Sequence, residues 1–102
     1  MAIINTSLTT IASNIQVSSG NTAISAMYFC NYGATATTFN LYAVPNGSTV
    51  GTNSQIYYNI QVAAGDTFVA DWEKLILGNG DTLRANASAN AAITATISYI
   101  GV

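Results

Sequence analysis

Few side chains in this chain could perform nucleophilic, acid–base or metal chemistry. The 102 residues include one cysteine and no histidine. A Ser-His-Asp or Cys-His arrangement is therefore excluded, and a zinc site lacks its usual ligands. Cys30 lies among apolar residues in the middle of an expected strand, which predicts a buried and unreactive thiol. A lone cysteine cannot form an internal disulfide, so the cysteine content favours neither an oxidising nor a reducing compartment.

Four carboxylates remain as candidates for a calcium site or a glycosidase pair. They are Asp66, Asp71, Glu73 and Asp81. Asp66 and Asp81 each stand in an expected turn, where binding to the local backbone is enough to explain them. We favour a structural role for all four over calcium binding, and calcium binding over catalysis. We therefore predict no catalytic residue, no metal ligand and no cofactor.

A repeated unit, Gly65-Asp66-Thr67 and Gly80-Asp81-Thr82, predicts the same turn used twice. Glycine permits a positive φ, and the aspartate can accept a hydrogen bond from the backbone N–H two residues on. The β-branched threonine and the apolar residue after it then begin a strand. Gly65, Asp66, Gly80 and Asp81 are thus predicted to be structural turn residues.

Apolar and polar residues alternate with a period of two along most of the chain, which indicates β-strands. Residues 55–62, 82–88 and 93–100 show this pattern most clearly. The residues predicted to point inward are Ile56, Tyr58, Ile60, Val62, Leu83, Ala85, Ala87, Ile93, Ala95, Ile97 and Tyr99. Tyr57 is predicted to point outward.

The front half of the chain is less regular. Residues 8–17 predict one strand that breaks near Ser13-Asn14. Residues 22–32 predict a central strand, with Tyr28 and Cys30 on one face and Met27 and Phe29 on the other. Tyr28 is also predicted to point inward. Glu73-Lys74 is predicted to lie at a bulge or corner.

Together the pattern predicts an all-β protein, a single antiparallel β-sandwich that is jelly-roll-like or immunoglobulin-like. We expect seven to eight strands in one domain, residues 1–102, with residues 1–7 as a possible N-terminal arm.

Charged residues make up only 6% of the chain, and its net charge is −2. Two cations cannot form the basic patch that nucleic acid requires. No apolar run approaches the roughly 18 residues that span a bilayer, and the first residues lack the cationic start of a signal peptide. We therefore expect neither a nucleic-acid partner nor a membrane partner. A surface so poor in charge suits a subunit that functions in an assembly.

Three stretches, residues 31–42, 75–88 and 93–99, carry a resemblance. The first is a polar turn followed by a Thr-rich strand, the second contains Leu77-Gly78-Asn79-Gly80-Asp81-Thr82-Leu83, and the third is a final strand of alternating Thr and Ser. This pattern resembles small single-domain β-sandwich virion proteins of tailed bacteriophages, of the capsid decoration or cement type. The resemblance implies a non-enzymatic structural protein that is made in the host cytoplasm and located on the capsid surface. It also implies two partners, the major capsid protein and further copies of the chain, often as a homotrimer.

Two further functions remain open. The chain could be a phage tail, fibre or head–tail adaptor subunit. It could also be a carbohydrate-binding module, although most of its aromatic residues are predicted to lie in the core.

The short apolar segment at the N-terminus is predicted to assist assembly. Ile3 and Ile4 would be exposed on an isolated arm, and burying them against a neighbouring copy or the capsid would stabilise the contact. The alternative is that Ile3-Ile4 extends the edge of its own sandwich.

Overall fold

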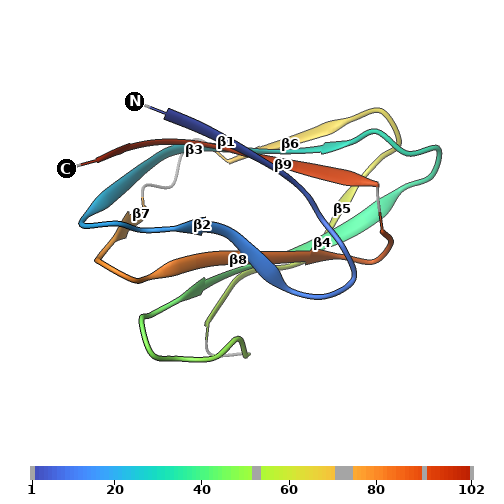
Figure 1. The fold of residues 1–102 in the computed structure, drawn as a ribbon. Coiled ribbons are helices and arrows are strands. Elements are labelled where there is room, and N and C mark those ends of the chain that lie inside the picture. The colour runs from blue at the N-terminus through green and yellow to red at the C-terminus, as the bar shows by residue number, and fades with distance from the viewer. Residues whose placement is uncertain (1, 52–53, 71–74, 91, 102) are drawn as a thin grey trace.

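The structure, a computed structural model, describes residues 2–51, 54–70, 75–90 and 92–101. Within these ranges the chain forms nine β-strands (Figure 1). They are β1 (Ala2–Ser7), β2 (Ser13–Val17), β3 (Thr22–Asn31), β4 (Thr37–Val44), β5 (Gln55–Val62), β6 (Thr67–Ala70), β7 (Leu75–Leu77), β8 (Thr82–Ala87) and β9 (Ile93–Gly101). The predicted all-β class is confirmed, with nine strands instead of seven or eight. None of the described residues forms a helix able to cross a membrane.

The strands form two antiparallel sheets that pack face to face. Sheet A has the order β1-β9-β3-β6, with β7 also paired to β3, and sheet B has the order β2-β8-β4-β5. The pairing is nested, because β1 pairs with β9, β2 with β8, β3 with β6 and β7, and β4 with β5. A long hairpin rolled up in this way is a jelly roll. Of the two topologies expected from the sequence, the chain therefore adopts the jelly roll.

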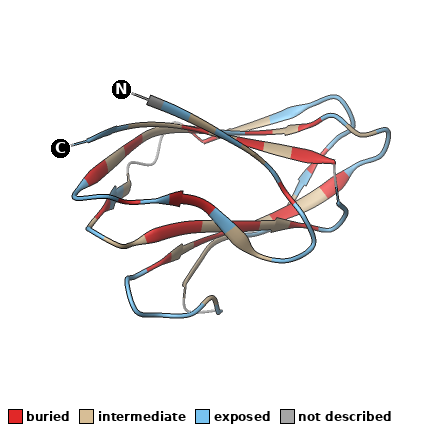
Figure 2. Cartoon of the chain, in the orientation of Figure 1, coloured by how far each residue is buried: buried red, intermediate tan, exposed pale blue. Residues whose placement is uncertain are grey.

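The core lies between the sheets (Figure 2) and is aromatic at its centre. Phe29 of β3 stacks on Phe39 of β4, with ring centroids 4.1 Å apart, so these two rings join the sheets. Phe68 and Tyr57 extend the cluster, and their rings meet edge to face at 5.4 Å. Such aromatic pairs stabilise the fold by more than the burial of their surface area alone.

The alternation predicted for the last two strands is confirmed. Leu83, Ala85 and Ala87 of β8 are buried, as are the first three inward residues of β9, namely Ile93, Ala95 and Ile97. Tyr99 is partly buried and packs against the core.

The orientation predicted for the tyrosines of β5 was wrong. Tyr57 packs against the core, whereas Tyr58 is 67% exposed. The cause is a bulge, because Asn59 has a φ of 58° and the register between β4 and β5 shifts beside it. An extra residue in one strand moves every residue beyond it to the opposite face. Ile60 and Val62 lie beyond the bulge and keep their predicted inward side.

A bulge in β3 also changed which residues share a face. The register with β9 shifts between Ile24 and Ala26, so Ile24 is buried on the same side as Met27 and Phe29. Tyr28, predicted to point inward, is 39% exposed. Cys30, predicted to be buried, is only partly buried.

The N-terminal part differs from its prediction in two ways. Residues 2–17 form two strands, with β1 in sheet A and β2 in sheet B, instead of an arm and one broken strand. The join between them contains Leu8, which is fully buried. The bulge or corner predicted at Glu73-Lys74 lies outside the described residues.

Candidate functional site

The two Gly-Asp-Thr turns are the sequence-predicted sites, and both glycines have the predicted positive φ. At the first turn Gly65 has a φ of 76°. Its N–H donates to the carbonyl of Asn31 (2.9 Å), and the Asn31 N–H donates to the carbonyl of Asp66 (2.9 Å). These two bonds continue the pairing of β3 with β6 into the turn.

Asn31 is the buried residue that holds this first turn. Its side-chain Nδ2 donates to the carbonyls of Thr35 and Val62, both at 2.9 Å, and its Oδ1 accepts from the N–H of Gly33 at 2.9 Å. The side chain is fully buried and its polar atoms are paired, as buried amides require. Asn31 therefore ties together the ends of β3, β5 and the loop before β4.

The second turn repeats the same backbone pair with another buried polar residue. Gly80 has a φ of 86°, its N–H donates to the carbonyl of Ser18 (2.9 Å), and the Ser18 N–H donates to the carbonyl of Asp81 (2.9 Å). Ser18 follows β2 and precedes β3, whereas Asn31 ends β3. The two turns therefore lie at opposite ends of the sandwich.

The aspartate carboxylates bind other groups than predicted. Asp66 Oδ1 accepts from the N–H of Thr67, one residue on (2.8 Å). Asp81 Oδ1 accepts from the N–H of Asn46 (2.8 Å), and its Oδ2 accepts from the N–H of Gly78 (2.9 Å). Each of these contacts differs from the predicted bond to the N–H two residues on. Asp81 instead joins its own turn to the end of the β4 hairpin.

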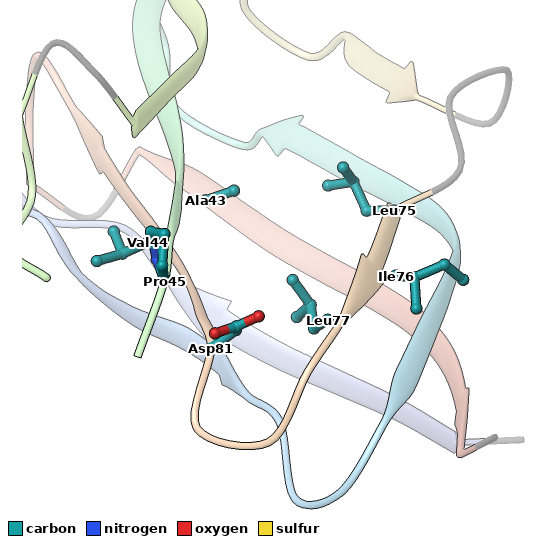
Figure 3. A pocket seen from close by; sticks show the side chains of 7 residues that line it. All are labelled: Ala43, Val44, Pro45, Leu75, Ile76, Leu77 and Asp81. Atoms are coloured by element: carbon teal, nitrogen blue, oxygen red, sulfur yellow. The ribbon is translucent and has the colours of Figure 1, made fainter. Parts of the chain in front are cut away.

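A hollow of about 140 Å³ lies beside Asp81 (Figure 3). Its wall consists of apolar residues from the end of β4 and from β7, with Asp81 as the one carboxylate among them. The apolar residues of the wall are Ala43, Val44, Pro45, Leu75, Ile76 and Leu77. Both carboxylate oxygens of Asp81 already accept backbone hydrogen bonds. The described residues that line the hollow therefore offer apolar contact but no second polar side chain to orient a substrate.

The described residues contain no cluster suited to a metal ion. No three His, Cys, Asp or Glu side chains gather anywhere in the described ranges. Asp66 and Asp81 are separated by the length of the sandwich, and Asp71 and Glu73 lie outside the described residues. Arg84 Nε donates to Thr82 Oγ1 (3.3 Å), on the strand that follows the second turn.

Ile3 and Ile4, the predicted assembly residues, belong to edge strand β1. Ile3 pairs with Ser98 and Ile4 with Ile97 of β9. Ile4 packs against the core, whereas Ile3 is 67% exposed on the outer face of sheet A. The chain thus adopts the alternative in which this segment extends its own sandwich, and only Ile3 remains available to a partner.

The outer face of sheet A carries an exposed aliphatic row that the sequence did not reveal. Ala23 of β3 lies between Ile76 of β7 and Ile100 of β9, as its direct cross-strand neighbour on each side. Ile76 is 65% exposed and Ile100 is 41% exposed. We call these three residues the aliphatic row. Its signal in the sequence was hidden because Ile76 and Ile100 stand next to inward residues, Leu77 and Tyr99.

The outer face of sheet B is instead crossed by amides. Asn40 Nδ2 of β4 donates to Asn86 Oδ1 of β8 (2.9 Å), and Asn40 Oδ1 accepts from the N–H of Asn59 of β5 (2.7 Å). This second bond holds the bulge in β5. The outward position of Asn86 was predicted, but its partner lies on a strand 46 residues away.

Comparison of this chain with protein-family models, with curated protein sequences and with solved structures found no match.

Proposed function

We propose that this chain is a non-enzymatic structural subunit of a bacteriophage particle, of the capsid decoration or cement type. The observation that carries the proposal is the aliphatic row on the outer face of sheet A. The described residues of this sheet face carry no charge, and such a partly apolar surface suits a permanent contact with another protein, because interface cores are depleted of charged residues. The major capsid protein is the proposed partner, and the surface of the virion is the proposed location.

The physical basis of binding would be burial of this row together with hydrogen bonds from the hydroxyl groups around it. Burying apolar surface contributes about 25 cal/mol per Å². Thr94, Thr96 and Ser98 line the same face of β9 and could donate or accept across the joint. Few charges take part, so binding should depend little on salt.

The geometry around the two described aspartates, Asp66 and Asp81, also favours a structural role over catalysis. A general acid or base needs a carboxylate oxygen within reach of a substrate. Asp81 uses both oxygens to hold backbone N–H groups of Asn46 and Gly78. Asp66 caps the start of β6 on an exposed turn, away from the hollow.

The test is binding to capsids of the virus that encodes the chain. Mass spectrometry of purified particles should find the protein in a fixed ratio to the major capsid protein. Ile76→Lys should reduce co-sedimentation with capsids at least about tenfold, which corresponds to roughly 1.4 kcal/mol. The matched control, Val17→Lys, puts the same charge in place of an exposed aliphatic residue on β2 of sheet B, away from the proposed contact, and should bind nearly as the unchanged protein does. Absence from particles, or equal loss in both variants, would contradict the proposal.

A tail, fibre or head–tail adaptor subunit would use the same kind of surface, and the location of the protein in a particle map separates it from a decoration protein. A carbohydrate-binding module is less well supported. Sugar sites commonly present aromatic rings together, but the exposed tyrosines are divided, with Tyr28 on β3 of sheet A, Tyr32 just after β3 and Tyr58 on β5 of sheet B. Specific binding on a glycan array would favour this alternative.

A further inference from the structure

The four edges of the two sheets differ in how they are protected against pairing with another chain. Exposed edges present unpaired N–H and C=O groups, and proteins commonly blunt them with bulges, proline, charge or short strands. In the described part of the chain, β2 has a register shift between Asn14 and Gln16. The β5 edge is bent at Asn59, and the remaining edge of sheet A is divided between the short strands β6 and β7.

Strand β1 has none of these protections. Its pairing with β9 runs without a shift from Ala2 to Ser7, and it contains neither proline nor a charged side chain. It is also the last strand of sheet A, so its other side has no partner strand among the described residues (Figure 1). A regular, uncharged edge of this kind can template another strand.

The hydrogen bonding shows which backbone groups of β1 are free. The N–H of Leu8 donates to the carbonyl of Ile93, in the same register as the pairing of β1 with β9. Antiparallel pairs alternate between bonded and non-bonded positions. The backbone groups of Ala2, Ile4 and Thr6 therefore face β9, and those of Ile3, Asn5 and Ser7 face away from the sheet.

We propose that β1 pairs with β1 of a second copy, antiparallel across a two-fold axis, so that the two A sheets become one continuous sheet. An axis through Asn5 would place Ile3 opposite Ser7 of the second copy and would satisfy the free backbone groups of Ile3, Asn5 and Ser7 on both chains. No like charges meet in this arrangement. The inference rests on the proposed assembly role, because it names the contact by which copies of the subunit join.

The properties of the four sheet edges favour a second copy of the chain as the partner of β1. Pairing through β1 and a different edge would give an open or cyclic array, including a trimer. The other three edges are bulged or divided, so the regular partner that the chain offers to β1 is β1 itself. A contact between two identical edges is isologous and closes as a dimer. This differs from the homotrimer that the resemblance implies.

Sedimentation of the isolated full chain tests the proposal directly. The unchanged protein should show a reversible monomer–dimer equilibrium. Asn5→Pro removes one free N–H without removing a bond to β9, and it should weaken the dimer at least about tenfold, because the proline ring also blocks close approach of the second strand. The matched control, Asn5→Ala, keeps that N–H and should dimerise nearly as well. A monomer at all concentrations, a trimer, or equal dimerisation by both variants would overturn the proposal.

Hydrogen exchange of the unchanged protein gives a second measurement that does not depend on whether the proline variant folds. The amides of Asn5 and Ser7 should become protected as protein concentration rises, whereas those of Ile4 and Thr6 should be protected at every concentration. Fast exchange at Asn5 and Ser7 at all concentrations would overturn the dimer. Capsid binding is a separate readout, so loss of the dimer with capsid binding intact would overturn this inference and leave the proposed function standing.

Discussion

The two Gly-Asp-Thr turns have the same sequence and the same backbone bonds, yet their side chains are used differently. At the first turn the buried side chain of Asn31 makes the long-range bond, to Val62, and Asp66 Oδ1 accepts from the N–H of its neighbour Thr67. At the second turn Asp81 itself makes a long-range bond, to Asn46, and Asn79 Oδ1 makes another by accepting from the N–H of Gly20. The tripeptide thus fixes the local conformation, whereas its surroundings decide which residue carries the stability.

The glycines should show the largest difference between the turns. A Cβ on Gly80 would lie 2.6 Å from side-chain atoms of Asn46, whereas one on Gly65 would meet nothing within 4 Å. Gly80→Val combines a strained positive φ with this contact and should cost about 3 kcal/mol. Gly65→Val carries only the strain and should cost about 1–2 kcal/mol. Urea denaturation measures both. Equal losses would show that the contact with Asn46 relaxes freely.

For the buried residues that hold the turns, the larger loss of stability is expected at the first turn. Asn31→Ala leaves the carbonyls of Thr35 and Val62 and the N–H of Gly33 without their partner, and should cost about 2–3 kcal/mol. Ser18→Ala also loses side-chain bonds, but the shorter side chain leaves a smaller void and should cost about 1 kcal/mol. Thermal unfolding compares them. Equal losses would show that the two turns depend equally on their buried polar residue, and a larger loss from Ser18→Ala would reverse the predicted difference.

Much of the fold could be predicted from local pattern, and the rest depended on partners distant in sequence. The alternation of polar and apolar residues was enough to predict the buried faces of β8 and β9, because both strands are regular. Neither the bulge at Ser25 nor the bulge at Asn59 was predicted. The bulge at Asn59 is held by Asn40 of another strand, which the local pattern does not indicate. The glycine conformations at both turns were predictable from residue type. The bond from Asp81 to Asn46 was not, because it joins loops 35 residues apart. The aliphatic row arises from three strands and became visible only with the register.

The two aspartates offer a sharper version of the same comparison. Asp81→Ala leaves the N–H groups of Asn46 and Gly78 without an acceptor at a partly buried position, and should cost about 1.5–2 kcal/mol. Asp66→Ala loses one local bond on an exposed turn, and should cost less than about 1 kcal/mol. Chemical denaturation gives both values. Asp81→Asn, which keeps one acceptor oxygen, should fall between them, and a loss as large as that of Asp81→Ala would indicate that the charge of Asp81 matters more than its geometry.

The smallest effect is expected at Arg84, which tests whether charge or hydrogen bonding holds the second turn. Arg84 Nε donates to Thr82 Oγ1, whereas the oxygens of Asp81 accept from backbone N–H groups. Arg84→Gln should therefore cost less than about 1 kcal/mol, as expected for a partly exposed charge outside a buried pair. The free energies of unfolding of the unchanged protein and of Arg84→Gln should also change little between low and high salt. Salt screens charge pairs but hardly affects backbone hydrogen bonds. A loss from Arg84→Gln that exceeds the loss from Gly80→Val, and that shrinks as salt is added, would mean that an ion pair stabilises the turn.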